Sequence, residues 1–349
     1  MEILQNILTF FSQTLIIVLA IVIVLVTIAS LIAKAKAHKS FDIELLHEKY
    51  KDQTQALKSV VLNSAELKLE KKRLKKEQKN KKEEQAKAAA SPSVPTKARI
   101  FVINFLKGDI KASASENLRE EVSTILGIAT PQDEVVVCVE SPGGLVHSYG
   151  FAAAQLLRIR NANIPLTVCV DQVAASGGYL MACTANKILA APFALIGSIG
   201  VVAQVPNFNR LLKKHNVDYK EYTAGDYKRT VSLFGEITDK GEAKFKEQLE
   251  ITHELFKSFV STNRPHMDIL KVATGEYWYG ELALKLGLVD EIKTSDDYLV
   301  AKAKDDHQVI KISFEQKPSF SDKISDIFSK AFSLTVSKII EQNDLAKKI

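Results

Sequence analysis

From Arg99 onward, short apolar segments rich in β-branched residues alternate with longer helical segments, and this alternation limits the fold more than any other feature. Residues 99–108, 134–140 and 165–171 have the composition of buried strands, and helical segments at 115–129 and 148–163 separate them. A repeated strand-helix-strand order predicts a parallel sheet whose connections are right-handed crossover helices. We therefore predict an α/β fold.

Two glycine-rich turns follow strands of this predicted sheet. They read ESPGGL at 140–145 and AASGGY at 174–179. Ligands of parallel α/β folds bind beyond the carboxyl ends of the strands. Both turns therefore lie where a functional site is expected.

Ser176 lies in the second turn, where a strand gives way to a buried helix. Backbone N–H groups at a helix start have no partner within the helix, and small neighbours leave room for a substrate backbone. Those are the needs of a nucleophile beside an oxyanion hole. The alternative is that the hydroxyl of Ser176 only caps the helix, and the turn alone does not distinguish the two.

A serine nucleophile needs a base. His147 follows the first turn, but a helix-start or surface role competes for it. A neutral lysine is the other candidate, and neutrality near pH 7 requires lowering the lysine pKa from about 10.4 by roughly 3.4 units, or about 4.6 kcal/mol. That cost excludes solvated lysines. Lys228, which has Gly, Tyr and Thr neighbours in YTAGDYKRT (222–230), is the candidate.

The N-terminal part of the chain has the pattern of a membrane anchor. Residues 15–33 form an uncharged apolar run, and no charge occurs in residues 3–14 either. About 20 apolar residues span a bilayer, so we predict a transmembrane anchor within 1–33, with a cleaved signal peptide as the alternative. Lysines follow the run and none precedes it, which directs the body to the cytoplasm by the positive-inside rule.

The basic character of the chain belongs to the segment after this anchor. The net charge is +6, and residues 34–87 alone contain 16 Lys and Arg against 9 Asp and Glu. With almost no aromatic residues, this segment is typical of a solvated helical stalk rather than of a nucleic-acid-binding surface; attraction to anionic lipid is a second reading. Its last residues, AAASPSVPTK (88–97), indicate a linker.

A second uncharged stretch at 188–205 could be another membrane span or a set of short core strands. Pro192 and Gly197 interrupt it, which favours short strands and turns. A span there would also put Ser176 and Lys228 on opposite faces of a bilayer about 30 Å thick. We therefore predict buried strands and turns.

The cysteines and the C-terminal part complete the pattern. Three cysteines in apolar contexts, without metal-ligand spacing, predict buried free thiols and no metal. Residues 307–315 resemble a final strand, and 319–342 have the periodicity of an amphipathic helix that packs on a neighbouring subunit or lies on a membrane surface.

Five motifs in this order resemble the signal peptide peptidase A family of serine proteases: ESPGG, AASGGY, IGSIGV, AGDYKR and LALKLGLVDEI. The anchor and the charged segment make the likeness strongest to the inner-membrane branch of that family in bacteria. The resemblance implies a Clp protease/crotonase-like fold over 98–305, after the anchor (1–33) and the stalk and linker (34–97). A C-terminal strand and amphipathic helix (306–349) follow.

The resemblance also implies a site. Ser176 would be the nucleophile, Lys228 the general base, and Ser198 the hydroxyl that orients the lysine amine. The backbone N–H groups of Gly144 and Gly177 would form the oxyanion hole. Members of the family assemble into rings and can build each Ser-Lys dyad from two subunits, and they use no cofactor.

The expected function is hydrolysis of signal-peptide remnants or of unfolded and membrane-released peptides at the bacterial inner membrane. Characterised relatives place the catalytic body outside that membrane, against the positive-inside rule, so the side stays undecided. Alkaline phosphatase fused after Ser93 would distinguish the two. An enzyme of acyl-CoA thioesters and a catalytically idle membrane scaffold are the alternatives; the first explains neither the anchor nor Lys228.

Overall fold

The computed structural model describes residues 39–89, 98–106 and 108–316. The chain forms two compact units. Residues 43–313 form the larger unit. The smaller unit consists of residues 1–42 and 314–349, of which the structure describes only 39–42 and 314–316. The expected anchor at 15–33, most of the linker and the helix at 319–342 lie outside the described residues. Among the helices that are described, none is both long and apolar enough to cross a bilayer.

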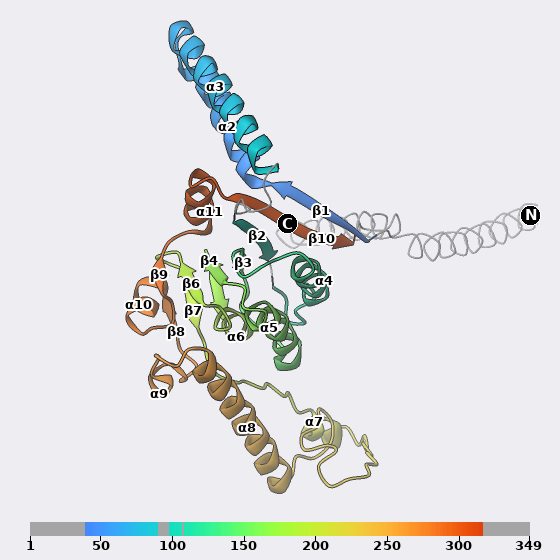
Figure 1. Cartoon of the computed structure of the whole chain (residues 1–349). Coiled ribbons are helices and arrows are strands. Elements are labelled where there is room, and N and C mark those ends of the chain that lie inside the picture. The colour runs from blue at the N-terminus through green and yellow to red at the C-terminus, as the bar shows by residue number, and fades with distance from the viewer. Residues whose placement is uncertain (1–38, 90–97, 107, 317–349) are drawn as a thin grey trace, which may run out of the picture. The chain divides into compact units, whose positions relative to one another are not determined.

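A seven-stranded sheet organises the fold (Figure 1). Its order is β1-β10-β2-β3-β4-β6-β9, and the neighbours from β10 to β9 all pair in parallel. The predicted parallel sheet is therefore confirmed. The strands are β1 (Lys39–Leu45), β2 (Arg99–Phe105), β3 (Glu134–Val139), β4 (Leu166–Val170), β6 (Lys187–Ala190), β9 (Glu291–Ile292) and β10 (Gln308–Gln316).

Both faces of the sheet are covered, which explains why its strands read as unbroken apolar runs. In β3, Val135, Val137 and Val139 join one core cluster, whereas Val136 and Cys138 join another. The first cluster includes apolar residues of α4 (Ser115–Leu126) and α5 (Val146–Asn161). The second includes Tyr298 and Leu299 of α11 (Ser295–Lys304). All three cysteines are buried free thiols, as predicted.

A second, three-stranded sheet carries the turn of Ser176. It consists of β5 (Val173–Ala175), β7 (Leu195–Gly197) and β8 (Tyr277–Tyr279), with β5 and β7 parallel and β8 antiparallel. The uncharged stretch 188–205 thus contains most of β6, all of β7 and the turns around them. The prediction of core strands there is confirmed.

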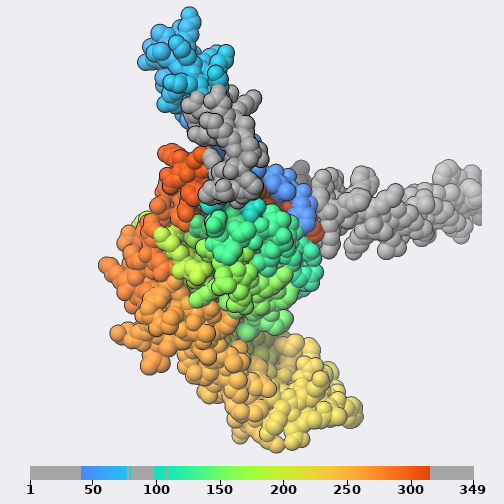
Figure 2. All heavy atoms as spheres, in the orientation of Figure 1, coloured from blue at the N-terminus to red at the C-terminus, as the bar shows by residue number. Residues whose placement is uncertain are grey.

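The segment 201–238 extends from the sheets and contains one short helix, α7 (Asn209–Lys214). Phe234 contacts Phe208 and Tyr219 within it, and Tyr227 lies under the amines of Lys240 and Lys244 at the start of α8 (Asp239–Asn263). Figure 2 shows this segment in yellow as a lobe beside α8. Many of its apolar side chains are exposed, with Tyr222 at 88% and Val202 at 80%.

The charged segment before the linker is helical, as expected, but begins differently. It forms α2 (Leu46–Val61) and α3 (Ser64–Ala89), which an ion pair of 2.7 Å between Lys58 and Glu70 connects. Residues 39–45 are not part of the stalk. They form β1, which lies next to β10 in the sheet. The only sign of a strand in the sequence is the alternation of apolar and acidic residues in FDIEL, within a charged segment.

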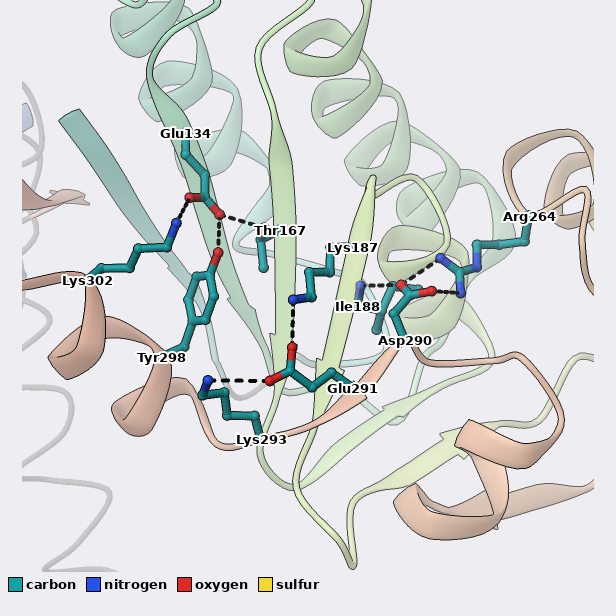
Figure 3. Close-up of polar contacts among 10 residues, drawn as sticks. All are labelled: Glu134, Thr167, Lys187, Ile188, Arg264, Asp290, Glu291, Lys293, Tyr298 and Lys302. Carbon is teal, nitrogen blue, oxygen red and sulfur yellow. Dashed lines mark hydrogen bonds and ion pairs between the residues drawn. The ribbon is translucent and has the colours of Figure 1, made fainter. Parts of the chain in front are cut away.

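Partly buried ion pairs connect the C-terminal elements to the sheet (Figure 3). Glu134 accepts hydrogen bonds from Thr167, Tyr298 and Lys302. Burial raises the pKa of Glu134, but these three donors outweigh it and the pKa lies below its ordinary value. Arg264 precedes α9 (Ile269–Val272) and Asp290 follows α10 (Gly280–Lys285), and the two side chains form two hydrogen bonds to each other. Asp290 also accepts from the N–H of Ile188 in β6.

Candidate active site

Ser176 occupies a strained turn between β5 and α6 (Gly177–Ala182). Its φ is 52° and its ψ −117°, a conformation that costs a non-glycine residue about 1–3 kcal/mol and that concentrates at functional sites. Its N–H donates to the carbonyl of Gly197 at 2.8 Å, which ties the turn to the end of β7. Its hydroxyl makes no capping hydrogen bond to α6. A helix cap therefore does not account for this serine.

The first glycine-rich turn packs directly against the Ser176 turn. Gly143 has a φ of +91°, and a Cβ on it would lie 2.6 Å from the N of Gly177 and 2.8 Å from the Cβ of Ser176. Ser141 connects the same two segments, since its carbonyl accepts from the N–H of Ala175 at 3.0 Å. The two motifs, which begin 34 residues apart in the sequence (140 and 174), thus form one surface.

A cavity of about 190 Å³ opens at this surface. Its floor includes Ser176, Gly144 and Gly177, and its walls are mainly apolar. The N–H groups of Gly144 and Gly177 donate to no protein acceptor within the described residues. The remaining lining residues are Val146, Gly150, Leu180, Gly200, Val201, Thr252, Leu255, Phe256 and Phe259.

These groups have the chemistry of an acyl-transfer site. A hydroxyl stands beside two unpaired N–H donors in a cavity with mainly apolar walls. Donors fixed in advance stabilise the oxyanion of a tetrahedral intermediate, and each contributes on the order of 2.7–4 kcal/mol. The structure therefore brings together three of the expected site residues: Ser176, Gly144 and Gly177.

The other two expected residues are not part of this cavity lining. Ser198 directly follows Gly197, has a φ of 52° and donates its N–H to the carbonyl of Glu276 at 2.6 Å. Lys228 lies in an exposed turn of the 201–238 segment, where its N–H donates to the carbonyl of Gly225. Its amine has no hydrogen bond or ion pair to any described residue of this chain. His147, the competing base, is exposed in the first turn of α5.

Sequence reasoning missed two groups of residues at the site. One is the cavity wall on α8, where Thr252, Leu255, Phe256 and Phe259 share one helix face. Their spacing of three, four and seven positions was a readable signal. The other is the pair Ser141 and Tyr149, whose hydroxyls meet beneath the first turn. No local pattern connects these two residues.

Comparison with known proteins shows the family to which the chain belongs. The family model for "Peptidase family S49" matches residues 158–310, and that for "Peptidase family S49 N-terminal" matches residues 2–156. The chain belongs to peptidase family S49, and so to the proteases.

Within that family, the chain is of the SohB type. It is 48% identical to "Probable protease SohB" of Haemophilus influenzae over 328 residues, 92% of each chain. The identity to "Probable protease SohB" of Buchnera aphidicola subsp. Schizaphis graminum is 46%, over 88% of each chain. For the protein of the same name from subsp. Schlechtendalia chinensis it is 54%, over 58% of this chain and 66% of that protein. The expected branch of the family is thereby confirmed.

Proposed function

We propose that this protease is a serine endopeptidase in which Ser176 attacks the peptide carbonyl. Lys228 takes the hydroxyl proton, Ser198 orients the lysine amine, and the N–H groups of Gly144 and Gly177 hold the oxyanion. The observation that carries the proposal is the strained Ser176 turn beside these two unpaired donors. The parallel sheet and its crossover helices agree with a Clp protease/crotonase-like fold.

Lys228 serves as the base when it belongs to a neighbouring copy of the chain. In a single chain it is exposed, and a lysine acts as a general base only where water is kept from its amine. The segment that carries it also exposes large apolar residues, among them Tyr222 and Val202. Contact between copies in a homo-oligomeric ring buries these residues and removes water from the amine, and that desolvation lowers a lysine pKa.

The substrates we propose are apolar peptides, such as signal-peptide remnants and unfolded or membrane-released peptides. Val146, Leu180, Phe256 and Phe259 give the cavity apolar walls, which suits an apolar substrate side chain. Residues 15–33 would anchor the protease in the bacterial inner membrane, close to such peptides.

A fluorophosphonate reagent tests the nucleophile. It phosphonylates an activated serine: the serine oxygen bonds to phosphorus and fluoride leaves. We expect the full chain, extracted in detergent, to carry the label on the tryptic peptide that contains Ser176, with peptide cleavage lost in step with labelling. Label on a different serine, or cleavage that survives complete labelling of Ser176, would contradict the proposal.

Gly150 offers a test of the substrate class. It lines the cavity from α5, and a Cβ added there meets nothing within 4 Å. In Gly150→Leu the new side chain narrows the cavity, while replacing a helical glycine favours the fold by up to about 1 kcal/mol. We expect kcat/KM to fall about tenfold for a peptide with leucine before the cleaved bond and to stay within twofold for alanine there.

The matched control for Gly150→Leu is Ala154→Leu. Ala154 is one turn further along α5, exposed and outside the cavity lining. Cleavage of quenched-fluorescence peptides measures both variants, and the control should treat the two peptides as the parent does. Equal losses for both peptides in Gly150→Leu would mean that the cavity does not hold the substrate side chain.

A further inference from the structure

We propose that Tyr149 and Ser141 are positioning residues that fix the distance between the two oxyanion-binding N–H groups. The inference rests on the proposed function, because it concerns how Gly144 and Gly177 are held. Tyr149 comes from α5 and Ser141 from the first glycine-rich turn. Both side chains are fully buried, with exposed fractions of 0%.

The hydrogen bonds of the two hydroxyls have one consistent direction. The Oη of Tyr149 lies 2.8 Å from the carbonyl oxygen of Asp109, which can only accept, so the phenol donates there. The proton in the 2.5 Å contact between the two hydroxyls therefore comes from Ser141. The Oγ of Ser141 in turn accepts from the N–H of Gly143 at 3.1 Å. A chain of donors thus runs from Gly143 through Ser141 and Tyr149 to Asp109.

The chain of donors fixes the turn that presents Gly144. Gly143 immediately precedes Gly144, so its hydrogen bond to Ser141 sets where the Gly144 N–H points. Asp109, at the other end, lies beside Ile110, whose carbonyl accepts from the N–H of Leu145 at 2.8 Å. The loop at 109–110 and the turn at 140–145 are therefore held on both sides of Gly144.

The ring of Tyr149 holds the other donor. A Cβ on Gly177 would lie 2.3 Å from the Cγ of Tyr149, so the ring packs directly under the start of α6. Ser141 also touches this helix, since a Cβ on Gly178 would lie 2.4 Å from its carbonyl oxygen. The ring of Tyr149 thus contacts the segment of Gly177. Its hydroxyl is connected, through Ser141, to the turn of Gly144.

Burial makes the network sensitive to loss of either hydroxyl. Water cannot replace a missing partner at a site with no exposed surface, so the remaining group must move or stay unpaired. Burial also raises the pKa of Tyr149, which keeps the phenol protonated and able to donate. A shift of the first turn misaligns the Gly144 N–H, and the loss of a complete oxyanion donor lowers kcat by about 10²–10³-fold.

The test compares Tyr149→Phe and Ser141→Ala with the parent, as the full chain in detergent. Each variant removes one hydroxyl and retains the packing. We expect kcat to fall about tenfold in each, with KM within twofold, because the oxyanion exists only beyond the ground state. The kcat of the double variant should be no more than about threefold below that of either single variant, since both substitutions break the same chain of donors.

Tyr298→Phe is the matched control. Tyr298 is also buried and also donates its hydroxyl to a protein acceptor, Glu134 at 2.6 Å, but it belongs to the other core cluster (Figure 3). We expect this variant to lower the Tm at least as much as Tyr149→Phe while its kcat stays within twofold of the parent. A general loss of stability would therefore not produce the expected pattern.

A peptide aldehyde gives a second readout. The Oγ of Ser176 bonds to the aldehyde carbon, and the hydroxyl proton passes to the aldehyde oxygen through the base, so the adduct occupies the oxyanion hole. We expect both variants to bind the aldehyde about tenfold more weakly and the corresponding product peptide unchanged. If Ser176→Ala is inactive, two results overturn the positioning role of Tyr149 and Ser141. One is that both variants keep the parent kcat and aldehyde affinity, and the other is that they lose equal affinity for the aldehyde and for the product peptide. Activity that persists in Ser176→Ala overturns the proposed function instead.

Discussion

Replacement of Ser176 by alanine is expected to lower kcat/KM for peptide cleavage by about 10⁴–10⁶-fold. The hydroxyl is the atom that would form the acyl-enzyme, so no neighbouring group replaces it. The fold should be unaffected, because the side chain of Ser176 makes no capping hydrogen bond and alanine fits the space it leaves. We expect the Tm to change by no more than about 2 °C, as for a substitution without a structural role.

The comparison for this variant is Ser123→Ala. Ser123 lies on the exposed face of α4, outside the cavity lining, and donates its hydroxyl to the carbonyl of Arg119 at 2.7 Å. Its variant should cleave labelled casein and quenched peptides at the parent rate. Cleavage by Ser176→Ala at more than about 1% of the parent rate would show that another group is the nucleophile, because removal of the true nucleophile leaves far less.

The sheet and the Ser176 turn could be predicted from the sequence because local physics determines them. Continuous apolar runs form strands that are buried on both faces, and a serine among alanines and glycines marks a turn with open backbone donors. The expected strand at 134–140 and helix at 148–163 differ from the observed β3 and α5 by at most two residues at either end. Residues 39–45 could not be assigned, since their pairing partner β10 lies more than 260 residues away.

The parts of the site that the sequence did not reveal depend on distant contacts. Tyr149 is one apolar position among many in α5 until the fold brings its hydroxyl to Ser141. Lys228 was selected by its neighbours and by family resemblance, yet its environment depends on what covers the 201–238 segment. In the proposed function, its role as a base therefore depends on contact between copies rather than on the local sequence.

The assembly itself gives the second prediction of large effect, made with two inactive variants. Lys228→Ala alone is expected to lose about 10³–10⁴-fold in kcat, because it removes the proposed general base. Ser176→Ala keeps that lysine, and Lys228→Ala keeps the serine. If each dyad combines the serine of one copy with the lysine of the next, a mixed ring contains some complete sites. Random mixing in equal amounts should restore about one quarter of the parent activity, since each residue is intact in half of the copies.

The mixture distinguishes a shared dyad from one made within a single chain. Complementation requires subunits to exchange, so the two variants are to be co-expressed with different affinity tags and the doubly tagged complexes purified from detergent. If each dyad were made within one chain, every site in these complexes would lack one of its two residues, the serine or the lysine. The mixture would then stay as inactive as each variant alone.

Recovery also requires contact between copies near the segment that carries Lys228. Tyr222→Asp, which puts a charge on a side chain that is 88% exposed in the single chain, should therefore abolish recovery when both partners carry it. Recovery that persists with this charge would place the contact elsewhere on the surface.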